Sequence, residues 1–308
     1  MSFRSGLPQL EGDLFVTDGG LETTLIFHRG LDLPAFAAFV LLRDEAGTDE
    51  LRRYYGPYVE LARERGAGLV LESPTWRASP RWAAELGIDE RQLDELNRRA
   101  IDLMEELRAG AGVTAVISGC IGPQDDGYNP AAKLTAAEAQ AYHATQIATF
   151  ADTAADMVTA VTMTYADEAE GLARAARAAG LPVVISFTVE TDGRLPSGQP
   201  LGEAIEQVDE ATGSVPAYYM INCAHPTHFE AALDTDRAWP ARIGGVRANA
   251  STKSHAELDE AEELDEGDPA DLGARHAMLR AKLPRLTVLG GCCGTDHRHV
   301  GEIIRAAG

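Results

Sequence analysis

The stretch Gly290-Gly291-Cys292-Cys293-Gly294-Thr295-Asp296 joins a short apolar run to the last amphipathic segment of the chain. The run before it, residues 286–289, predicts a buried strand, and the apolar spacing over residues 300–304 predicts a final helix. Thr295 is the expected N-cap of that helix, with Asp296 in its first turn. Because the flanking glycines let the backbone leave strand geometry, we expect both cysteine sulfurs to turn to the same side.

The same order of strand, turn and helix repeats along the whole chain. We expect strands at residues 14–17, 69–71, 113–117, 157–161, 183–187, 217–221, 243–246 and 286–289. We expect the intervening helices at residues 51–65, 89–108, 135–150, 167–179, 201–208, 229–233 and 270–282, with Thr135 and Glu138 as a capping box. Eight such alternations in 308 residues predict an α/β fold, a (β/α)8 TIM barrel that forms a single domain over residues 1–308. A doubly wound open sheet is the alternative.

The composition is that of a globular protein and disfavours some classes of binding partner. The chain is 45% hydrophobic, which is enough for a large core, and its net charge of -21 disfavours nucleic acid and anionic membranes as partners. No apolar run approaches the roughly 20 residues of a membrane span, and the first residues lack the apolar core of a signal peptide. We therefore expect a cytoplasmic protein whose four cysteines are reduced. In that compartment clustered cysteines favour metal binding or catalysis over structural disulfides.

Polar residues concentrate just after the predicted strands, which is where barrel active sites lie. These residues are Asp18, Glu72, Thr75, Thr188, Glu190, Asn222, Cys223, Asn249, Cys292 and Cys293. In a closed barrel the sixth and eighth strands are separated by one strand. Cys223 is therefore expected to face the cysteine pair across the seventh strand.

Three grouped thiols predict a zinc site of the catalytic kind. Structural zinc sites usually fill all four tetrahedral positions with protein ligands, whereas three ligands leave one position for water or substrate. Three thiolates and Zn²⁺ carry a net charge of -1, which makes a poor Lewis acid for hydrolysis but accepts another thiolate. A bound substrate thiol loses its proton and stays nucleophilic. Alkyl transfer to sulfur follows more naturally from this centre than hydrolysis.

Other interpretations of these residues stay open at this stage. Cys292 and Cys293 are also consistent with buried packing or with a redox pair. Cys120 is expected to be a packed core thiol, and Glu190 an ordinary loop carboxylate. The nearby histidines are expected to cap helices or to contact solvent: His225, His297 and His299. The acidic stretch 257–268 is expected to be a surface loop or an exposed helix.

Three motifs together resemble the homocysteine S-methyltransferases: Asp18-Gly19-Gly20, Asn222-Cys223 and the stretch from Gly290 to Thr295. The resemblance extends from about residue 14 to residue 304. It implies a barrel in which Cys223, Cys292 and Cys293 hold zinc and act in catalysis through it. It also implies that the Asp18 turn helps to hold the amino-acid part of homocysteine, and that Thr75 lines the same pocket. The expected substrate-binding residues are Asp18, Gly19, Glu72, Thr75, Asn222 and Asn249.

The chain departs from the family pattern after the fourth strand. Family members usually carry Phe-Glu-Thr there, and the glutamate binds the substrate amine. The matching region, residues 159–164, contains no carboxylate. In one hypothesis Glu72 supplies the missing charge from a neighbouring strand. In the other, the acceptor is a different thiol.

The leading hypothesis is a zinc-dependent S-methyltransferase that moves a methyl group from an onium donor to the thiol of homocysteine, giving methionine. S-methylmethionine is the favoured donor because it leaves as a neutral thioether. The alternatives are a methyltransferase for a different small thiol and a non-catalytic zinc-binding or thiol-binding protein. The sequence lacks a Gly-x-Gly-x-x-Gly dinucleotide fingerprint, and it leaves the donor's identity and the oligomeric state open.

Overall fold

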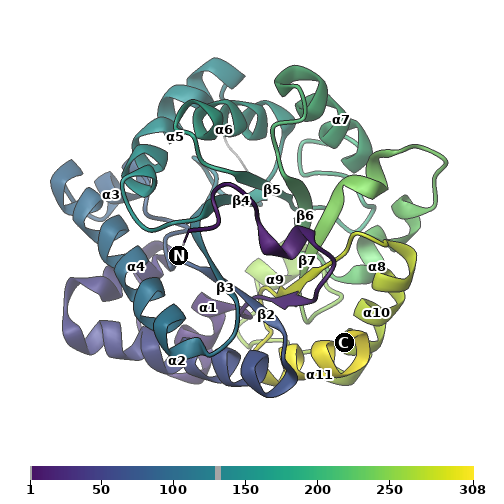
Figure 1. Cartoon of the computed structure of the whole chain (residues 1–308), viewed down its shortest axis with the longest axis horizontal. Helices are drawn as coiled ribbons and strands as arrows, with labels where there is room; N and C mark the ends of the chain where they lie inside the picture. The colour runs from purple at the N-terminus through teal and green to yellow at the C-terminus, as the bar shows by residue number, and fades with distance from the viewer. Residues whose placement is uncertain (1, 129–132) are drawn as a thin grey trace.

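Figure 1 shows a ring of strands surrounded by helices. The computed structural model describes residues 2–128 and 133–308, and within them eight parallel strands close into one barrel in sequence order. The strands are β1 (Phe15–Val16), β2 (Gly68–Glu72), β3 (Ala115–Ile121), β4 (Met157–Met163), β5 (Val183–Phe187), β6 (Tyr218–Asn222), β7 (Ile243–Ala248) and β8 (Val288–Gly291). The ring closes where Phe15 of β1 pairs with Val288 of β8. The predicted (β/α)8 barrel is confirmed, and the open-sheet alternative is wrong.

The eight predicted strands all exist, but some of their ends differ. Strand β3 begins at Ala115 and runs to Ile121, so Cys120 lies inside the strand and not in the loop after it. The reason is pairing with β4, where Cys120 is in register with Thr159. Gly119 in the same strand leaves room for the ring of Phe150, because a Cβ at that position would collide with it.

Helices follow the strands around the outside of the ring (Figure 1). They are α1 (Leu21–Thr23), α2 (Glu45–Arg65), α3 (Pro80–Glu85), α4 (Glu90–Ala111), α5 (Ala136–Ala151), α6 (Ala166–Ala178), α7 (Leu201–Thr212), α8 (Pro226–Phe229), α9 (His255–Asp259), α10 (Pro269–Lys282) and α11 (His297–Ala307). The predicted capping box of α5 is confirmed, since Thr135 and Glu138 cap each other's backbone. Among the described residues, no helix is long and apolar enough to cross a membrane.

The predicted N-cap of the last helix is wrong by one residue. Asp296 caps α11, and its carboxylate accepts a hydrogen bond from Arg298 N at 2.9 Å. The hydroxyl of Thr295 instead donates to the carbonyl oxygen of Cys292 at 2.7 Å. A threonine hydroxyl can serve the turn as well as the helix, and here the carboxylate is the better partner for the positive end of the helix.

The N-terminal segment packs against the beginnings of the strands and crosses the middle of the ring (purple in Figure 1). Leu7 packs in one apolar cluster with residues of the barrel interior: Phe15, Val70, Val116, Met157, Val184, Tyr218, Met220 and Val288. The side chain of Arg4 donates hydrogen bonds to the carbonyl oxygens of Ala151, the last residue of α5, and of Thr153 and Ala155 after it. This segment covers the N-terminal end of the barrel, and the cysteines lie at the other end.

Candidate metal centre and substrate cavity

Three cysteines meet at the C-terminal ends of two strands. Cys223 directly follows β6, and Cys292 and Cys293 directly follow β8. Their sulfur atoms all lie within 4.8 Å of one another. Strand β7 lies between β6 and β8, as the sequence predicted. The three residues line a cavity of about 520 Å³.

The sulfur atoms of Cys223 and Cys292 are joined as a disulfide, with their Cα atoms 5.4 Å apart. The expectation that all four cysteines are reduced is therefore wrong for this structure. The reason is proximity, because this Cα separation lies in the usual range for a disulfide. Cys292 pairs with the distant Cys223 and not with its neighbour Cys293, which is free. The structure therefore does not form the Cys292–Cys293 redox pair considered from the sequence.

Cys223 has an unusual backbone conformation, and the side chain of His255 contacts its carbonyl oxygen. Its φ angle is 52°, in the left-handed region that residues other than glycine seldom adopt. His255 Nε2 lies 2.6 Å from the carbonyl oxygen of Cys223, and His255 Nδ1 lies 3.1 Å from a carboxylate oxygen of Glu190. The expectation that Glu190 is an ordinary loop carboxylate is wrong, since it positions the histidine that contacts the strained cysteine.

Asn222 holds a second bend beside Cys223. Its side-chain oxygen accepts hydrogen bonds from Thr162 N at 2.9 Å and from the hydroxyl of Ser186 at 2.6 Å, and its amide donates to the hydroxyl of Thr162 at 2.8 Å. Thr162 has a φ of 65° and lies where the register between β4 and β5 shifts. Its hydroxyl is 3.9 Å from Cys223 Sγ. This bend therefore shapes the wall beside the cysteines.

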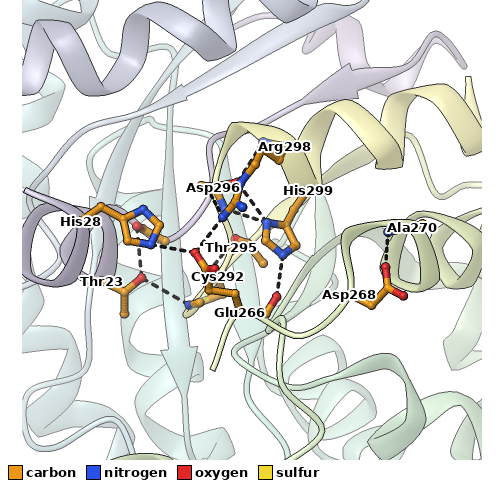
Figure 2. Close-up of polar contacts among 12 residues, drawn as sticks. Thr23, His28, Glu266, Asp268, Ala270, Cys292, Thr295, Asp296, Arg298 and His299 are labelled. Atoms are coloured by element: carbon orange, nitrogen blue, oxygen red, sulfur yellow. Dashed lines mark hydrogen bonds and ion pairs between the residues drawn. The ribbon is translucent and has the colours of Figure 1, made fainter. Parts of the chain in front are cut away.

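The turn that carries Cys292 and Cys293 requires its glycines. A Cβ on Gly290 would overlap the side chain of Thr17, and a Cβ on Gly291 would overlap the side chain of Thr295. Gly294 has a φ of 77°, and its N–H donates to the hydroxyl of Thr23 at 3.3 Å. Figure 2 shows Thr23, Cys292 and Thr295 around this turn. The turn is therefore fixed by both side-chain and backbone contacts.

An ion-pair network fixes the segment beside this turn (Figure 2). His28, Glu266 and Asp296 are close enough together to suggest a second metal site. Arg298 contacts a carboxylate oxygen of Glu266 and one of Asp296, each at 2.7 Å, so the two carboxylates already have a cation between them. His299, predicted to cap a helix, does so at Asp296. We interpret this cluster as structural.

Substitution of Gly291 by alanine is expected to lower the free energy of unfolding by about 1–3 kcal/mol, because the new methyl group displaces Thr295. The matched control is Gly301→Ala in α11, where a Cβ would come no closer than 3.6 Å to Leu61. That variant is expected to gain about 0.5–1 kcal/mol, since alanine is the better helix former. Urea unfolding measures both. Equal stability of the two variants would contradict the close approach at Gly291.

Asp18 lines the cavity and forms an ion pair with Arg247. Arg247 Nη2 lies 2.7 Å from Asp18 Oδ1, and the hydroxyl of Tyr54 donates to Asp18 Oδ2 at 2.9 Å. Both side chains of the pair are buried. Burial raises the pKa of Asp18, and the charge of Arg247 opposes that rise. Both carboxylate oxygens of Asp18 are therefore already used within the protein.

Glu72, the last residue of β2, is in the opposite situation. It is 3% exposed and lines the cavity. The hydroxyls of Ser118 and Thr159 are near enough to lower the pKa of Glu72, but neither carboxylate oxygen makes a hydrogen bond of ordinary geometry in the described part of the chain. Burial raises the pKa of Glu72 to about 7, against the lowering effect of the Arg247 charge. A buried carboxylate without partners is costly unless a ligand completes it.

The residues predicted to bind substrate divide into two groups. Asp18, Gly19 and Glu72 line the cavity together with the three cysteines. Thr75, Asn222 and Asn249 are buried and are not part of the lining. Thr75 donates from its hydroxyl to the carbonyl oxygen of Cys120 at 2.7 Å, which places it one layer behind the wall.

Cys120, expected to be a packed core thiol, is buried but borders the cavity. Burial raises the pKa of its thiol well above the usual value, so it is protonated at neutral pH.

The acidic stretch 257–268, which was expected to be a surface loop or an exposed helix, also contributes to the cavity wall. Leu258 and Asp259 at the end of α9, and Glu263 and Asp265 after it, line the cavity.

Sequence reasoning missed several residues of the wall. Arg247 follows directly after the apolar run predicted for β7, and a lone arginine at the C-terminal end of a barrel strand was the signal. Glu22 lies one turn after Asp18, in α1. Tyr128 comes from the loop after β3, with its hydroxyl 3.5 Å from Cys293 Sγ and its ring stacked on His255 at 4.0 Å. No local pattern marked Tyr128.

The mouth of the cavity is aromatic. The guanidinium of Arg77 lies 4.2 Å from the ring centroid of Trp76 and 3.6 Å from that of Trp82. Arg77 also donates to the carbonyl oxygen of Asp125 at 3.3 Å, which ties the loop after β3 to the segment after β2. Phe27 and Phe36 complete the rim, and each is 43% exposed.

Comparisons with known proteins agree with this geometry. A search of curated proteins found no match. The homocysteine methyltransferase MmuM from Escherichia coli, in its oxidized form, superimposes with a TM-score of 0.75 at 20% identity, covering 96% of this chain and 99% of that one. Its metallated form gives a TM-score of 0.72 at 22% identity, covering 95% and 96%. At these identities the likeness shows the fold.

The family assignment comes from the sequence match. The model of the homocysteine S-methyltransferase family matches residues 15–307, which is nearly the whole chain. The match includes the Asp18 turn, Cys223 and the Cys292-Cys293 turn. The chain therefore belongs to the homocysteine S-methyltransferase family and is a methyltransferase enzyme.

Proposed function

We propose that the protein is a zinc-dependent enzyme that transfers a methyl group from an onium donor, such as S-methylmethionine, to the thiol of homocysteine, giving methionine. The observation that carries this proposal is the group of three cysteine sulfurs within 4.8 Å of one another on the cavity wall. The cavity also suits an amino-acid acceptor, because the charged side chains of Glu72 and Arg247 line it together with the three cysteines.

The donor set fits zinc. Two sulfurs bound to one zinc ion lie about 3.8 Å apart, given Zn–S bonds of about 2.3 Å. Cys223, Cys292 and Cys293 meet that requirement within the 4.8 Å that separates them, and the cavity leaves the fourth side open. The disulfide between Cys223 and Cys292 must first be reduced for all three to bind as thiolates. A bound zinc ion would hold the acceptor sulfur as a thiolate.

The charge of the cavity favours a cationic donor. The acidic residues on the described wall are Asp18, Glu22, Glu72, Glu85, Asp126, Asp259, Glu263 and Asp265, against two arginines, Arg77 and Arg247. This excess of negative charge attracts an onium cation. In the transfer, the bond between the methyl carbon and the donor sulfonium breaks, and its electrons stay on the donor. The donor leaves as a neutral thioether, while the acceptor sulfur forms the new bond and its thiol proton goes to solvent.

Glu72 is proposed to bind the amine of homocysteine. The β4 bend at Thr162, in the region where the family pattern has a glutamate, carries no carboxylate among residues 159–164, and Met163 there is fully buried. Glu72 supplies a carboxylate with both oxygens free in the same cavity. An ammonium group is the natural partner for it.

The decisive experiment gives reduced, zinc-loaded protein homocysteine and S-methylmethionine and follows methionine by mass spectrometry. Catalytic formation of methionine from both substrates supports the proposal. If the protein is folded and zinc-loaded but makes no methionine, homocysteine or the donor is wrongly assigned. A panel of small thiols with the same donor then separates a wrong acceptor from a wrong donor.

Substitution Glu72→Gln is expected to raise KM for homocysteine by about 10–100-fold, the worth of one charge-assisted hydrogen bond. Because the pKa of Glu72 is about 7, its ionised fraction rises with pH through neutrality. KM of the wild type is therefore expected to fall between about pH 6 and about pH 8, and the variant loses this part of the dependence. Glu85→Gln, at an exposed position of the same wall, is the control. An unchanged KM in Glu72→Gln would remove Glu72 from the binding site.

A further inference from the structure

Arg247 is a buried cation in which one nitrogen of the guanidinium, Nη1, has no partner among the described residues. It is 7% exposed and lines the cavity. Its Nε donates to the carbonyl oxygen of Gly291 at 3.1 Å, and its Nη2 contacts Asp18 Oδ1 at 2.7 Å and the carbonyl oxygen of Gly19 at 3.2 Å. Its Nη1 makes no hydrogen bond to any residue that the structure describes. These contacts to two chain segments, residues 18–19 and residue 291, fix the plane of the guanidinium, and Nη1 remains available to a ligand.

The position of Arg247 in the sheet places this Nη1 group near the cysteines. In β7, Arg247 is in register with Asn222 of β6 and with Gly290 of β8, so it stands in the same layer as the cysteine-bearing strand ends. A guanidinium stays charged at any physiological pH and presents donors in a planar fork that matches a carboxylate. Asp18 uses only part of that fork.

Arg247 and Glu72 carry opposite charges in one cavity without contacting each other. Over residues 2–128 and 133–308, no ion pair within 4.0 Å joins them, although each affects the pKa of the other. Among the described residues, Glu72 has no ion-pair partner, and Arg247 has one nitrogen, Nη1, that its pair with Asp18 does not use. A carboxylate without a cation and an arginine with a spare donor, held apart on the wall of one cavity, are complementary to a zwitterion that fits between them.

We propose that Arg247, through Nη1, binds the α-carboxylate of the acceptor while Glu72 binds its ammonium group. This inference rests on the proposed function and assigns Arg247 as a second residue that determines which thiols bind. The two charges give the acceptor a fixed orientation, with its thiol directed toward Cys223, Cys292 and Cys293. A thiol that lacks the amine leaves the buried Glu72 carboxylate without a cation, and a thiol that lacks the carboxylate leaves Arg247 Nη1 without an acceptor, so both are expected to bind more weakly than homocysteine.

The test measures thiol binding without any methyl donor. Reduced, zinc-loaded protein is titrated calorimetrically with homocysteine and with 3-aminopropanethiol, which is the same thiol without its carboxylate. The variant is Arg247→Lys, which keeps the positive charge beside Asp18 but has no second fork nitrogen. Arg77→Lys, a second buried arginine of the same cavity, is the matched control. Circular dichroism and zinc content confirm that each variant is folded and loaded.

The wild type is expected to bind homocysteine about 10–100-fold more tightly than 3-aminopropanethiol. In Arg247→Lys this ratio falls to within about 3-fold, because only homocysteine loses affinity. In Arg77→Lys the ratio is unchanged. Equal affinity for the two thiols in the wild type, or a ratio that survives in Arg247→Lys, overturns the assignment of Arg247. If neither thiol binds, the proposed function itself is wrong and this inference falls with it.

A third thiol separates the two charged anchors. 4-Mercaptobutanoate keeps the carboxylate of homocysteine and lacks the amine. Its affinity is expected to depend on Arg247 and to be insensitive to Glu72→Gln. Sensitivity to both variants, or to neither, contradicts the division of roles between the two residues.

Discussion

Replacement of Cys293 by alanine is expected to abolish zinc retention and methyl transfer while leaving the barrel folded. Cys293 lies in a turn after β8, its side chain is partly exposed to the cavity, and it is not part of the disulfide. Loss of its sulfur therefore removes a proposed metal ligand without leaving a cavity in the core. Metal affinity is expected to fall by more than about 100-fold, because even the partners that orient metal ligands are worth about 10–100-fold.

The measurement combines zinc content after dialysis with methionine formation and thermal unfolding. The matched control is Cys120→Ala, since Cys120 also borders the cavity but lies in β3, apart from the three grouped sulfurs. Under the proposed function, that variant and the wild type are both expected to bind one zinc ion per chain. Turnover in Cys293→Ala, or zinc loss in Cys120→Ala alone, would show that the metal centre has been assigned to the wrong sulfurs.

Replacement of Asp18 by alanine is expected to cause the largest loss of stability, about 3–5 kcal/mol. The change leaves Arg247 as a buried charge without its carboxylate, and breaking one side of a buried ion pair typically costs that much. Tyr54 also loses one of its two hydrogen-bond acceptors, keeping only the carbonyl oxygen of Gly19. Urea unfolding of the reduced, metal-free protein measures the effect.

A double variant tests the cause of that loss. Asp18→Ala combined with Arg247→Met removes both charges and is expected to recover a large part of the stability, because no unpaired charge remains. The exposed Asp13, close by in the sequence, serves as the surface control: Asp13→Ala is expected to change stability by less than about 0.5 kcal/mol. A double variant no more stable than Asp18→Ala would show that the loss comes from packing and not from the charge.

The fold was predictable because its signals are local and repeated. Each apolar run is short and is followed by a segment with helical spacing, and closure of the ring then places strand six one strand away from strand eight. The grouping of Cys223 with Cys292 and Cys293 follows from that closure alone.

The rest of the site depends on contacts between residues far apart in the chain. Glu190 and His255 are both polar loop residues in the sequence, and only the fold brings them together behind Cys223. Arg247 lies one residue beyond its apolar run, so its burial depends on Asp18 more than 200 positions away. The acidic stretch 257–268 has the composition of a solvated surface, and its place in the cavity wall comes from the path of the chain.

The N-terminal segment has a kinetic consequence. Because it packs across the N-terminal end of the barrel, we expect substrates to reach the cysteines from the opposite end, where the cavity lies. The charged anchors Glu72 and Arg247 lie at the strand ends, deeper than the exposed rim of Phe27 and Phe36. Under the proposed function, we therefore expect the thiol to bind first and the methyl donor second. We also expect the methylated product to leave last, and a high concentration of donor to slow turnover by occupying the mouth of the cavity before the thiol arrives.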